Sequence, residues 1–367
     1  MHIRVFLFAF ILLAFSACKD DETNNTQPTD NFDRTAMLTH WADDIIIPGF
    51  EDYAATLAEL QATADAFNAN PSEATLNTLR ADWLEAYKLW QKVSMFDIGK
   101  AEAIGLRNFT NIYPTDVQGI SLNIETENYN LELPSNFDTQ GFPALDYLLY
   151  GVNDDDAQIV ATLSQANYAQ YLSDVVARLN DLTNEVLDDW TSGYRDTFIS
   201  NSASSATGSV DKLVNDFIFY YEKFLRAGKV GIPAGVFSGT PSPIHVETPY
   251  SGEFSKELFH VALDAVQDFF NGKNFRGAQK DYGLSDYLNY LETLKDGNDL
   301  SQAINNQLDT ARHTANELSP NFREQIETDH IKMLETYDEL QKAVVMLKVD
   351  MVQAFSIVID YVDADGD

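Results

Sequence analysis

The sequence contains a single cysteine, Cys18, so no disulfide can form within the chain. Basic residues are also scarce, because 24 Lys and Arg stand against 57 Asp and Glu, which gives a formal net charge of −33. Nucleic acid demands a basic surface, and anionic lipid head groups repel an acidic one. The composition therefore argues against nucleic acid as a partner and favours a body held away from lipid head groups.

The apolar run at 5–15 is too short to cross a bilayer, and it follows the basic residue Arg4. This pattern is typical of a signal peptide over residues 1–17. Small residues precede Cys18, as in the lipobox of bacterial lipoproteins, although Phe15 is larger than usual at its position. Cys18 is therefore the expected lipidation site, carrying acyl chains such as palmitate. The alternative is an ordinary cleaved secretory signal with an incidental cysteine.

Residues 18–32 lack apolar periodicity and are expected to form a flexible acidic tether. The tether begins with Lys19-Asp20-Asp21-Glu22, which resembles a signal that exports lipoproteins to the outer face of the outer membrane. The alternative is a solvated acidic linker. We therefore expect a protein anchored to the outer membrane by lipid and exposed at the cell surface.

Apolar side chains recur at helical spacing along most of the remaining chain, which predicts an all-α protein. Ser, Asn and Gly residues at 199–209 predict a boundary between an N-terminal helical bundle, 33–204, and a C-terminal one, 205–367. Helices are expected at 35–69 (broken near Pro48), 72–98 (capped by Ser72), 155–190, 210–230, 253–271, 283–295, 297–317, 321–346 and 348–362. Ile120, Leu122 and Ile124 alternate with polar residues, which predicts a short β-hairpin within 118–135.

The most informative motif is Gly141-Phe142-Pro143-Ala144-Leu145-Asp146, followed by an apolar run that ends at Gly151. It is similar to the Gly-x-His-x-x-Glu helix of the imelysin family, and several further motifs occur in the order found in that family. The other matching segments are Trp83-x-x-Ala86-x-x-x-Trp90 with Phe96-x-x-Gly99, Asn111-Ile-Tyr-Pro-Thr-Asp116, Asp211-Lys-Leu-Val-Asn-Asp216, Glu247-Thr-Pro-Tyr-Ser251 and Phe270-Asn-Gly272.

The resemblance implies two bundle-like helical domains with a cleft between them, a metal or peptidase chemistry, and a link with iron acquisition. This chain departs from the family at two ligand positions. Pro143 stands where the family has His, and Ser94 stands where many members have Glu. Asp146 takes the place of the motif Glu. We therefore expect a binding protein more than an enzyme, although a metallopeptidase with a rearranged site and a surface interaction protein without a ligand remain alternatives.

Two carboxylates are the candidate ligand or metal residues, Asp146 and Glu247. An oxygen-rich site around them suits iron or another divalent cation, with the cleft as its position. Each also has a structural explanation. Asp146 is predicted in the first turn of a helix, where a carboxylate interacts favourably with the helix dipole. Glu247 lies in a Gly- and Pro-rich loop and could simply be solvated.

A different metal geometry would use two Glu-x-x-His pairs, Glu257 with His260 and Glu327 with His330, as in di-iron bundles. His330 falls on an apolar stripe, whereas Glu257 and His260 fall on a polar face, so coincidence is the better explanation. No His-Glu-x-x-His, Gly-x-Ser-x-Gly or phosphate-binding glycine loop occurs in the sequence. The sequence thus predicts no catalytic residues.

Overall fold

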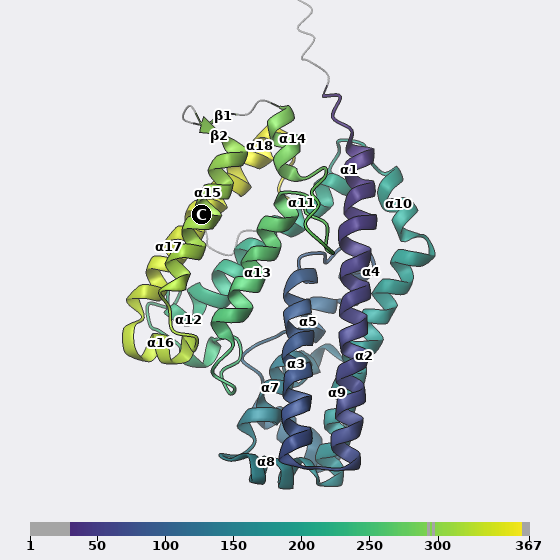
Figure 1. Ribbon diagram of the computed structural model, residues 1–367, viewed down its shortest axis with the longest axis vertical. Helices are drawn as coiled ribbons and strands as arrows, with labels where there is room; N and C mark the ends of the chain where they lie inside the picture. Colours follow the sequence, from purple (N-terminus) through teal and green to yellow (C-terminus); the bar gives the residue numbers. More distant parts are fainter. Residues whose placement is uncertain (1–29, 292–293, 296–297, 362–367) are drawn as a thin grey trace, which may run out of the picture. The chain divides into compact units, whose positions relative to one another are not determined.

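The computed structural model describes residues 30–291, 294–295 and 298–361. The expected signal peptide, Cys18 and nearly all of the tether lie outside these residues, so the lipid anchor stays a prediction. The described part is built almost entirely from helices, which confirms the all-α fold (Figure 1). None of its helices combines the length and the hydropathy that a membrane span requires.

The first half of the chain contains α1 (Arg34–His40), α2 (Ile47–Ala69), α3 (Glu73–Val93), α4 (Lys100–Ile104), α5 (Leu106–Thr110), α6 (Val117–Thr126), α7 (Gly141–Asp146), α8 (Asp156–Leu163), α9 (Ala166–Asp189) and α10 (Arg195–Ser200). The second half contains α11 (Ser209–Phe219), α12 (Ile232–Ala234), α13 (Ser255–Phe270), α14 (Leu284–Tyr290), α15 (Leu300–Asn316), α16 (Phe322–Asp329), α17 (Ile331–Val345) and α18 (Val352–Phe355).

Wider π-helical turns join several of these helices, at Trp41–Ile46 (η1), Tyr147–Gly151 (η3), Trp190–Tyr194 (η4), Tyr220–Gly231 (η5) and Met346–Met351 (η7). Short 3₁₀ helices occupy Pro134–Thr139 (η2) and Pro243–His245 (η6). The two described strands, β1 (Leu294–Lys295) and β2 (Asn298–Asp299), pair antiparallel with Leu294 opposite Asp299. The domain boundary near residue 205 stays a prediction.

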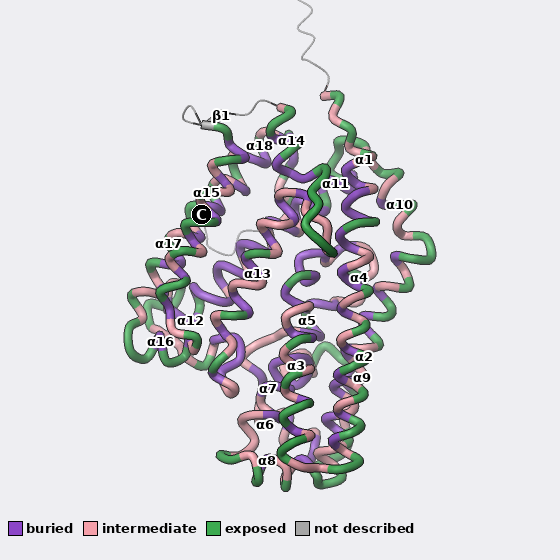
Figure 2. Tube along the Cα trace, viewed as in Figure 1, coloured by how far each residue is buried: buried purple, intermediate pink, exposed green. Residues whose placement is uncertain are grey.

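The three long helices α2, α3 and α9 pack side by side, and α13 lies against α3 (Figure 1). On the other side α15 packs on α17, which also contacts η5. Buried positions face the neighbouring helices along each of these elements (Figure 2). The predicted apolar face of α3 is confirmed, because Leu76, Leu79 and Trp83 are fully buried at helical spacing.

The start of α3 also follows its sequence signal. The Ser72 hydroxyl accepts the backbone N–H of Thr75 at 3.2 Å, and the Thr75 hydroxyl accepts the N–H of Ser72 at 3.0 Å. This reciprocal pair satisfies two N–H groups that the first helical turn leaves without partners. The predicted cap at Ser72 is therefore confirmed.

The predicted hairpin at 118–135 is wrong, because residues 117–126 form α6. The Asp116 carboxylate accepts the N–H of Gln118 at 3.0 Å and caps the helix. Ile120 and Ile124 are buried on one face, four residues apart, whereas Leu122 is 59 % exposed. Ile120 and Ile124 thus follow the helical spacing. Leu122 is exposed to solvent and, in the sequence, produced the alternating pattern of a strand.

Other helix boundaries also differ from expectation. The helix predicted at 155–190 divides into α8 and α9 around Ser164 and Gln165. The break expected near Pro48 does not occur, because Pro48 falls at the start of α2, where the wider turns of η1 give way to the α-helix. A proline is tolerated where the helical hydrogen-bond pattern changes.

Candidate functional site

Glu247 lies in the loop before α13, yet its side chain is only 2 % exposed. Its Oε1 accepts Gln91 Nε2 at 3.0 Å and Asn111 Nδ2 at 2.9 Å, and lies 3.0 Å from the Tyr87 hydroxyl. Its Oε2 forms a salt bridge with Lys229 Nζ. Glu247, a candidate ligand from the sequence with a solvated loop carboxylate as the alternative, is therefore the centre of a buried polar network.

The members of this network come from four separate elements. Tyr87 and Gln91 are one helical turn apart on the same face of α3, Asn111 follows α5, and Lys229 lies near the end of η5. The Tyr87 hydroxyl is also 2.6 Å from Asn111 Oδ1. Its single proton is thus shared between an amide oxygen and the Glu247 carboxylate. Glu247 joins the second half of the chain to two helices of the first.

Burial dominates the electrostatics of this network. It lowers the pKa of Lys229, although the attraction and hydrogen bond of Glu247 oppose that change. Burial and the charge of Glu247 raise the pKa of Tyr87 and of Tyr113 well above the usual value. Both phenols therefore remain protonated. A cavity of about 10 Å³, lined by Asn111, Tyr113, Lys229 and their neighbours, adjoins the network and has room for about one water molecule.

Asp146 is fully buried, and its position differs from the prediction. It is the last residue of α7, not part of its first turn, so the dipole of its own helix does not stabilise it. Its carboxylate instead accepts the backbone N–H groups of Tyr250 at 2.9 Å and Ser251 at 3.0 Å, in the turn before α13. Burial raises the pKa of Asp146 to about 6, while these hydrogen bonds oppose the shift. Asp146 thus fixes the far end of the Glu247 loop.

Close packing explains why the Gly141–Gly151 motif has glycine at both of its ends. Gly141 has a positive φ of 76°, and a Cβ there would lie 2.2 Å from the carbonyl oxygen of Thr110. A Cβ on Gly151 would lie 2.3 Å from the ring of Tyr250. Pro143 is buried in the first turn of α7, where a missing N–H costs no hydrogen bond. The motif thus brings α7 close to α5 and to the turn at Tyr250.

A resident metal ion does not fit Asp146 and Glu247 in this arrangement. The oxygens of Asp146 accept two backbone N–H groups, and those of Glu247 receive neutral donors and an ammonium group. A cation would have to displace these donors and approach Lys229. In residues 30–291, 294–295 and 298–361, moreover, His, Cys, Asp and Glu nowhere gather in threes around a potential metal position.

The two Glu-x-x-His pairs lie in different settings. Glu257 forms a salt bridge with Lys88 at 2.6 Å, and burial lowers the pKa of the half-buried His260. Glu327 is exposed and contacts Arg323 at 3.4 Å. The helix expected at 321–346 ends at Asp329 and restarts at Ile331, so His330 sits at a break between α16 and α17. That the two spacings are a coincidence stays a prediction.

Sequence reasoning missed Tyr87, Gln91 and Lys229 and treated Asn111 only as part of a turn motif. Lys229 carried a signal, since basic residues are scarce in this chain and its neighbours from Ala227 to Val230 carry no charge. Gln91 carried another, because it continues the buried face of α3 one turn after Tyr87. Neither signal names Glu247 as the partner, because Gln91 and Lys229 lie 156 and 18 residues from it, beyond the one turn over which helical spacing relates side chains.

Known proteins of similar fold exist. An imelysin-like protein from Psychrobacter arcticum 273-4 superposes with a TM-score of 0.70 at 19 % identity, covering 89 % of this chain and 97 % of that chain. A candidate iron-regulated protein A precursor from Parabacteroides distasonis ATCC 8503 gives a TM-score of 0.70 at 17 % identity, covering 87 % and 95 %. At these identities the likeness shows the fold alone.

Two sequence comparisons complement the structures. Iron-regulated protein A of Synechococcus elongatus is 24 % identical over 112 residues, which span 30 % of this chain and only 29 % of that protein. The sequence profile of the imelysin family matches residues 46–348. That match extends from η1 into η7 and includes every residue of the Glu247 network and Asp146. The chain therefore belongs to the imelysin family.

Proposed function

We propose that this protein is a lipid-anchored, non-catalytic binding component of iron or haem acquisition at the bacterial outer membrane. Two similar proteins carry the name iron-regulated protein A, and this supports the link with iron. The lipobox-like residues before Cys18 support the anchor, and Lys19-Asp20-Asp21-Glu22 supports the cell-surface position.

The observation that carries the non-catalytic role is the engagement of Asp146 and Glu247 by internal donors. A hydrolytic metal site needs carboxylate or imidazole lone pairs free for the metal, and a base beside the bound water. Here both carboxylates tie the 246–251 segment to the first half of the chain. Their proposed role is to hold the shape of a binding surface.

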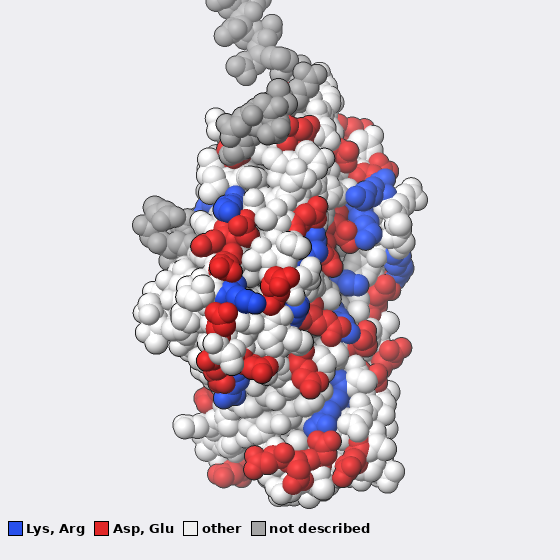
Figure 3. All heavy atoms as spheres, turned by 60° about the vertical axis from the view of Figure 1, so that its left-hand side comes forward, with Lys and Arg blue, Asp and Glu red and all other residues white. Residues whose placement is uncertain are grey.

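The size of the space beside Glu247 limits the ligand. Its cavity of about 10 Å³ admits about one water molecule, whereas pockets for organic ligands measure roughly 300–1,000 Å³. We therefore expect an iron complex, a haem or a partner protein to bind on the outer surface, where the 246–251 segment meets the first half of the chain. Acidic and basic side chains are interspersed over the face drawn in Figure 3, which suits polar contacts with a partner.

Growth under iron limitation tests the proposal. Deleting the gene is expected to slow growth on scarce iron salts or on haem, and the full-length protein is expected to restore it. Cys18→Ala should restore growth poorly, because the body would no longer be held at the membrane. A deletion strain that grows normally on both iron sources would refute the link with iron acquisition.

Metal analysis and a proteolysis assay test the non-catalytic part. Wild type and Asp146→Ala, incubated with iron or calcium salts and desalted, are expected to retain the same sub-stoichiometric metal. Cleavage of an unfolded protein substrate should not exceed background. Proteolysis that stops on addition of a chelator, or metal retained by wild type and lost in Asp146→Ala, would establish a metal site instead.

A further inference from the structure

A second cavity lies where η1 and α3 face α13, apart from the Glu247 network. Its volume is about 320 Å³, within the range of small-ligand pockets. Its apolar wall includes Ile45, Phe96 and Phe269, each at most 3 % exposed, and the ring of Phe275. The first three side chains close the wall from behind, and the half-buried ring of Phe275 is the aromatic surface that a ligand can contact.

The segment after α13 closes one side of this cavity and is anchored to the first half of the chain. The N–H of Phe275 donates to the carbonyl of Asp44 at 2.8 Å, and the Phe275 ring covers Gly49. Arg276 forms a salt bridge with Asp52. Figure 1 shows this green loop reaching from α13 toward α1 and α2. These anchors keep the cavity wall in place without a ligand.

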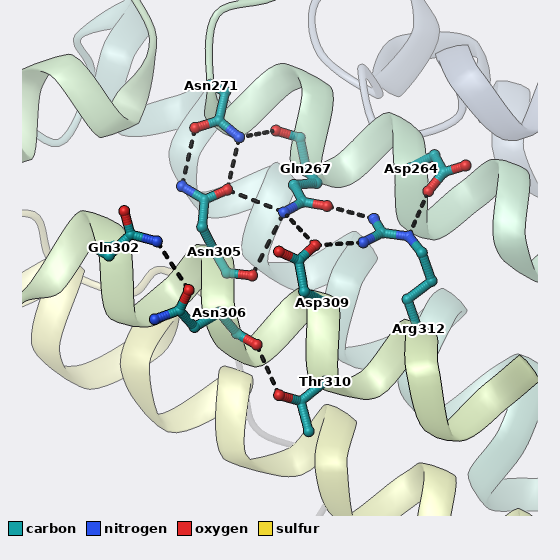
Figure 4. Close-up of polar contacts among 9 residues, drawn as sticks. All are labelled: Asp264, Gln267, Asn271, Gln302, Asn305, Asn306, Asp309, Thr310 and Arg312. Carbon is teal, nitrogen blue, oxygen red and sulfur yellow. Dashed lines mark hydrogen bonds and ion pairs between the residues drawn. The ribbon is translucent and has the colours of Figure 1, made fainter.

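The charges around the cavity are not balanced. Asp264 pairs with Arg312 at 2.8 Å, as Figure 4 shows, and Asp268 pairs with Lys273 at 2.7 Å. Lys92 also lines the cavity, but in the described part of the chain it takes part in no ion pair. Its ammonium group lies 5.8 Å from the centre of the Phe275 ring. Among the described residues that line this cavity, Lys92 is therefore a cation without a carboxylate partner.

A polar group in the cavity wall also lacks a partner. Asn274 lines the cavity, and its Oδ1 is shielded from water and accepts no hydrogen bond within the described residues. A buried acceptor without a donor is destabilising. A side-chain movement that turned this oxygen toward the cavity would let it accept a hydrogen bond from a ligand.

We infer that this cavity binds a small aromatic anion, with its rings against Phe275 and its carboxylate or sulfonate at Lys92. An aromatic body suits the half-buried ring of Phe275, and an anion complements the ammonium group of the cavity lining that has no carboxylate partner among the described residues. The inference is independent of the proposed role in iron acquisition, since it shares no residue with the Glu247 network.

Two matched fluorescent probes test the inference. 1-Anilinonaphthalene-8-sulfonate carries a sulfonate, and N-phenyl-1-naphthylamine has the same aromatic body without charge. Titration of the folded wild-type protein should give tighter binding of the sulfonate. Lys92→Gln should weaken the sulfonate about fivefold to tenfold, as expected for the loss of one charge-assisted contact, and change the neutral probe less than twofold.

Control variants locate the binding. Lys342→Gln removes an exposed lysine on α17 and should leave both probes unchanged. Ala265→Leu adds volume to the cavity lining and should weaken both probes, with circular dichroism confirming the fold. Sulfonate binding that is unaffected by Lys92→Gln, or insensitive to Ala265→Leu, would overturn the assignment. Displacement by 1-naphthoate but not by 1-naphthalenemethanol would support it further.

Discussion

Lys229 and Glu247 form a salt bridge in which the side chains are only 4 % and 2 % exposed. Removing both charges from water is costly, and their attraction offsets this cost only while the pair stays intact. Gln91 and Asn111 satisfy further acceptor positions of the carboxylate. The pair therefore fixes the loop before α13 against η5, and breaking one side of it leaves an uncompensated buried charge.

Lys229→Met is expected to lower the free energy of unfolding by about 3–5 kcal/mol, because Glu247 would stay buried without its cation. The double variant Lys229→Met/Glu247→Gln should recover part of that loss. Urea unfolding followed by circular dichroism measures both. Lys342→Met, which removes an exposed partner of Glu339, should change stability by less than about 0.5 kcal/mol. A Lys229→Met loss as small as that of the control would contradict the assigned role.

Asp146 gives the stability a defined pH dependence. Its pKa rises from 3.8 to about 6 in the folded state, so folding favours the protonated form. Protonation of Asp146 stabilises the folded state by up to about 3 kcal/mol. This stabilisation is fully present below about pH 4 and is lost as the pH rises through about 6. Asparagine does not titrate in this range. The unfolding free energy of wild type, measured relative to that of Asp146→Asn, should therefore fall between about pH 4 and pH 8. A difference that stays constant over this range would refute the raised pKa.

Asn271 and Asn305 join α13 and α15 through two reciprocal amide hydrogen bonds of 2.7 and 3.0 Å (Figure 4). Asn271→Ala should lower the unfolding free energy by about 1 kcal/mol, since it leaves a half-buried amide without its partner. Asn306→Ala is the matched control, because its side chain contacts Gln302 on the exposed face, and about 0.5 kcal/mol or less is expected. Thermal unfolding of the two variants compares them; equal effects would argue against the amide pair.

Residues 117–126 offer a direct test of helix against hairpin. Ile120→Ala should cost about 2–5 kcal/mol, because Ile120 is fully buried and leaves a cavity. Leu122→Ala should be nearly neutral, since Leu122 is 59 % exposed. A hairpin would place Ile120, Leu122 and Ile124 on one face and make the variants similar. Denaturant unfolding therefore distinguishes the two structures by the ratio of the losses.

The helical fold followed from local chemistry that the sequence contains. The buried residues of α3 recur at helical spacing, and the cap at Ser72 needs only the neighbouring Thr75. Such signals act within one or two turns and depend little on the rest of the chain. Residues 120–124 fit both the spacing of a helix and the alternation of a strand. The packing of α6 on α9 selected the helix.

The candidate site could not be predicted in this way. The sequence suggested Asp146 and Glu247 as ligand or metal residues, with a structural explanation as the alternative for each. In the structure they accept hydrogen bonds from Tyr250 and Tyr87, which lie 104 and 160 residues away along the chain. No periodicity encodes a contact at such separations, so both the burial and the hydrogen bonds of these carboxylates were beyond sequence reasoning.

The sequence by itself determined the all-α class, the scarcity of positive charge, the caps and buried faces of the long helices, and the resemblance to imelysin. These depend on composition and on short-range periodicity. Only the tertiary structure decided that Glu247 is buried against Lys229 and that Asp146 binds backbone N–H groups. The physical reason is that the environment of a carboxylate is set by whatever distant segments fold around it, and that environment decides whether it serves as a ligand or as a structural acceptor.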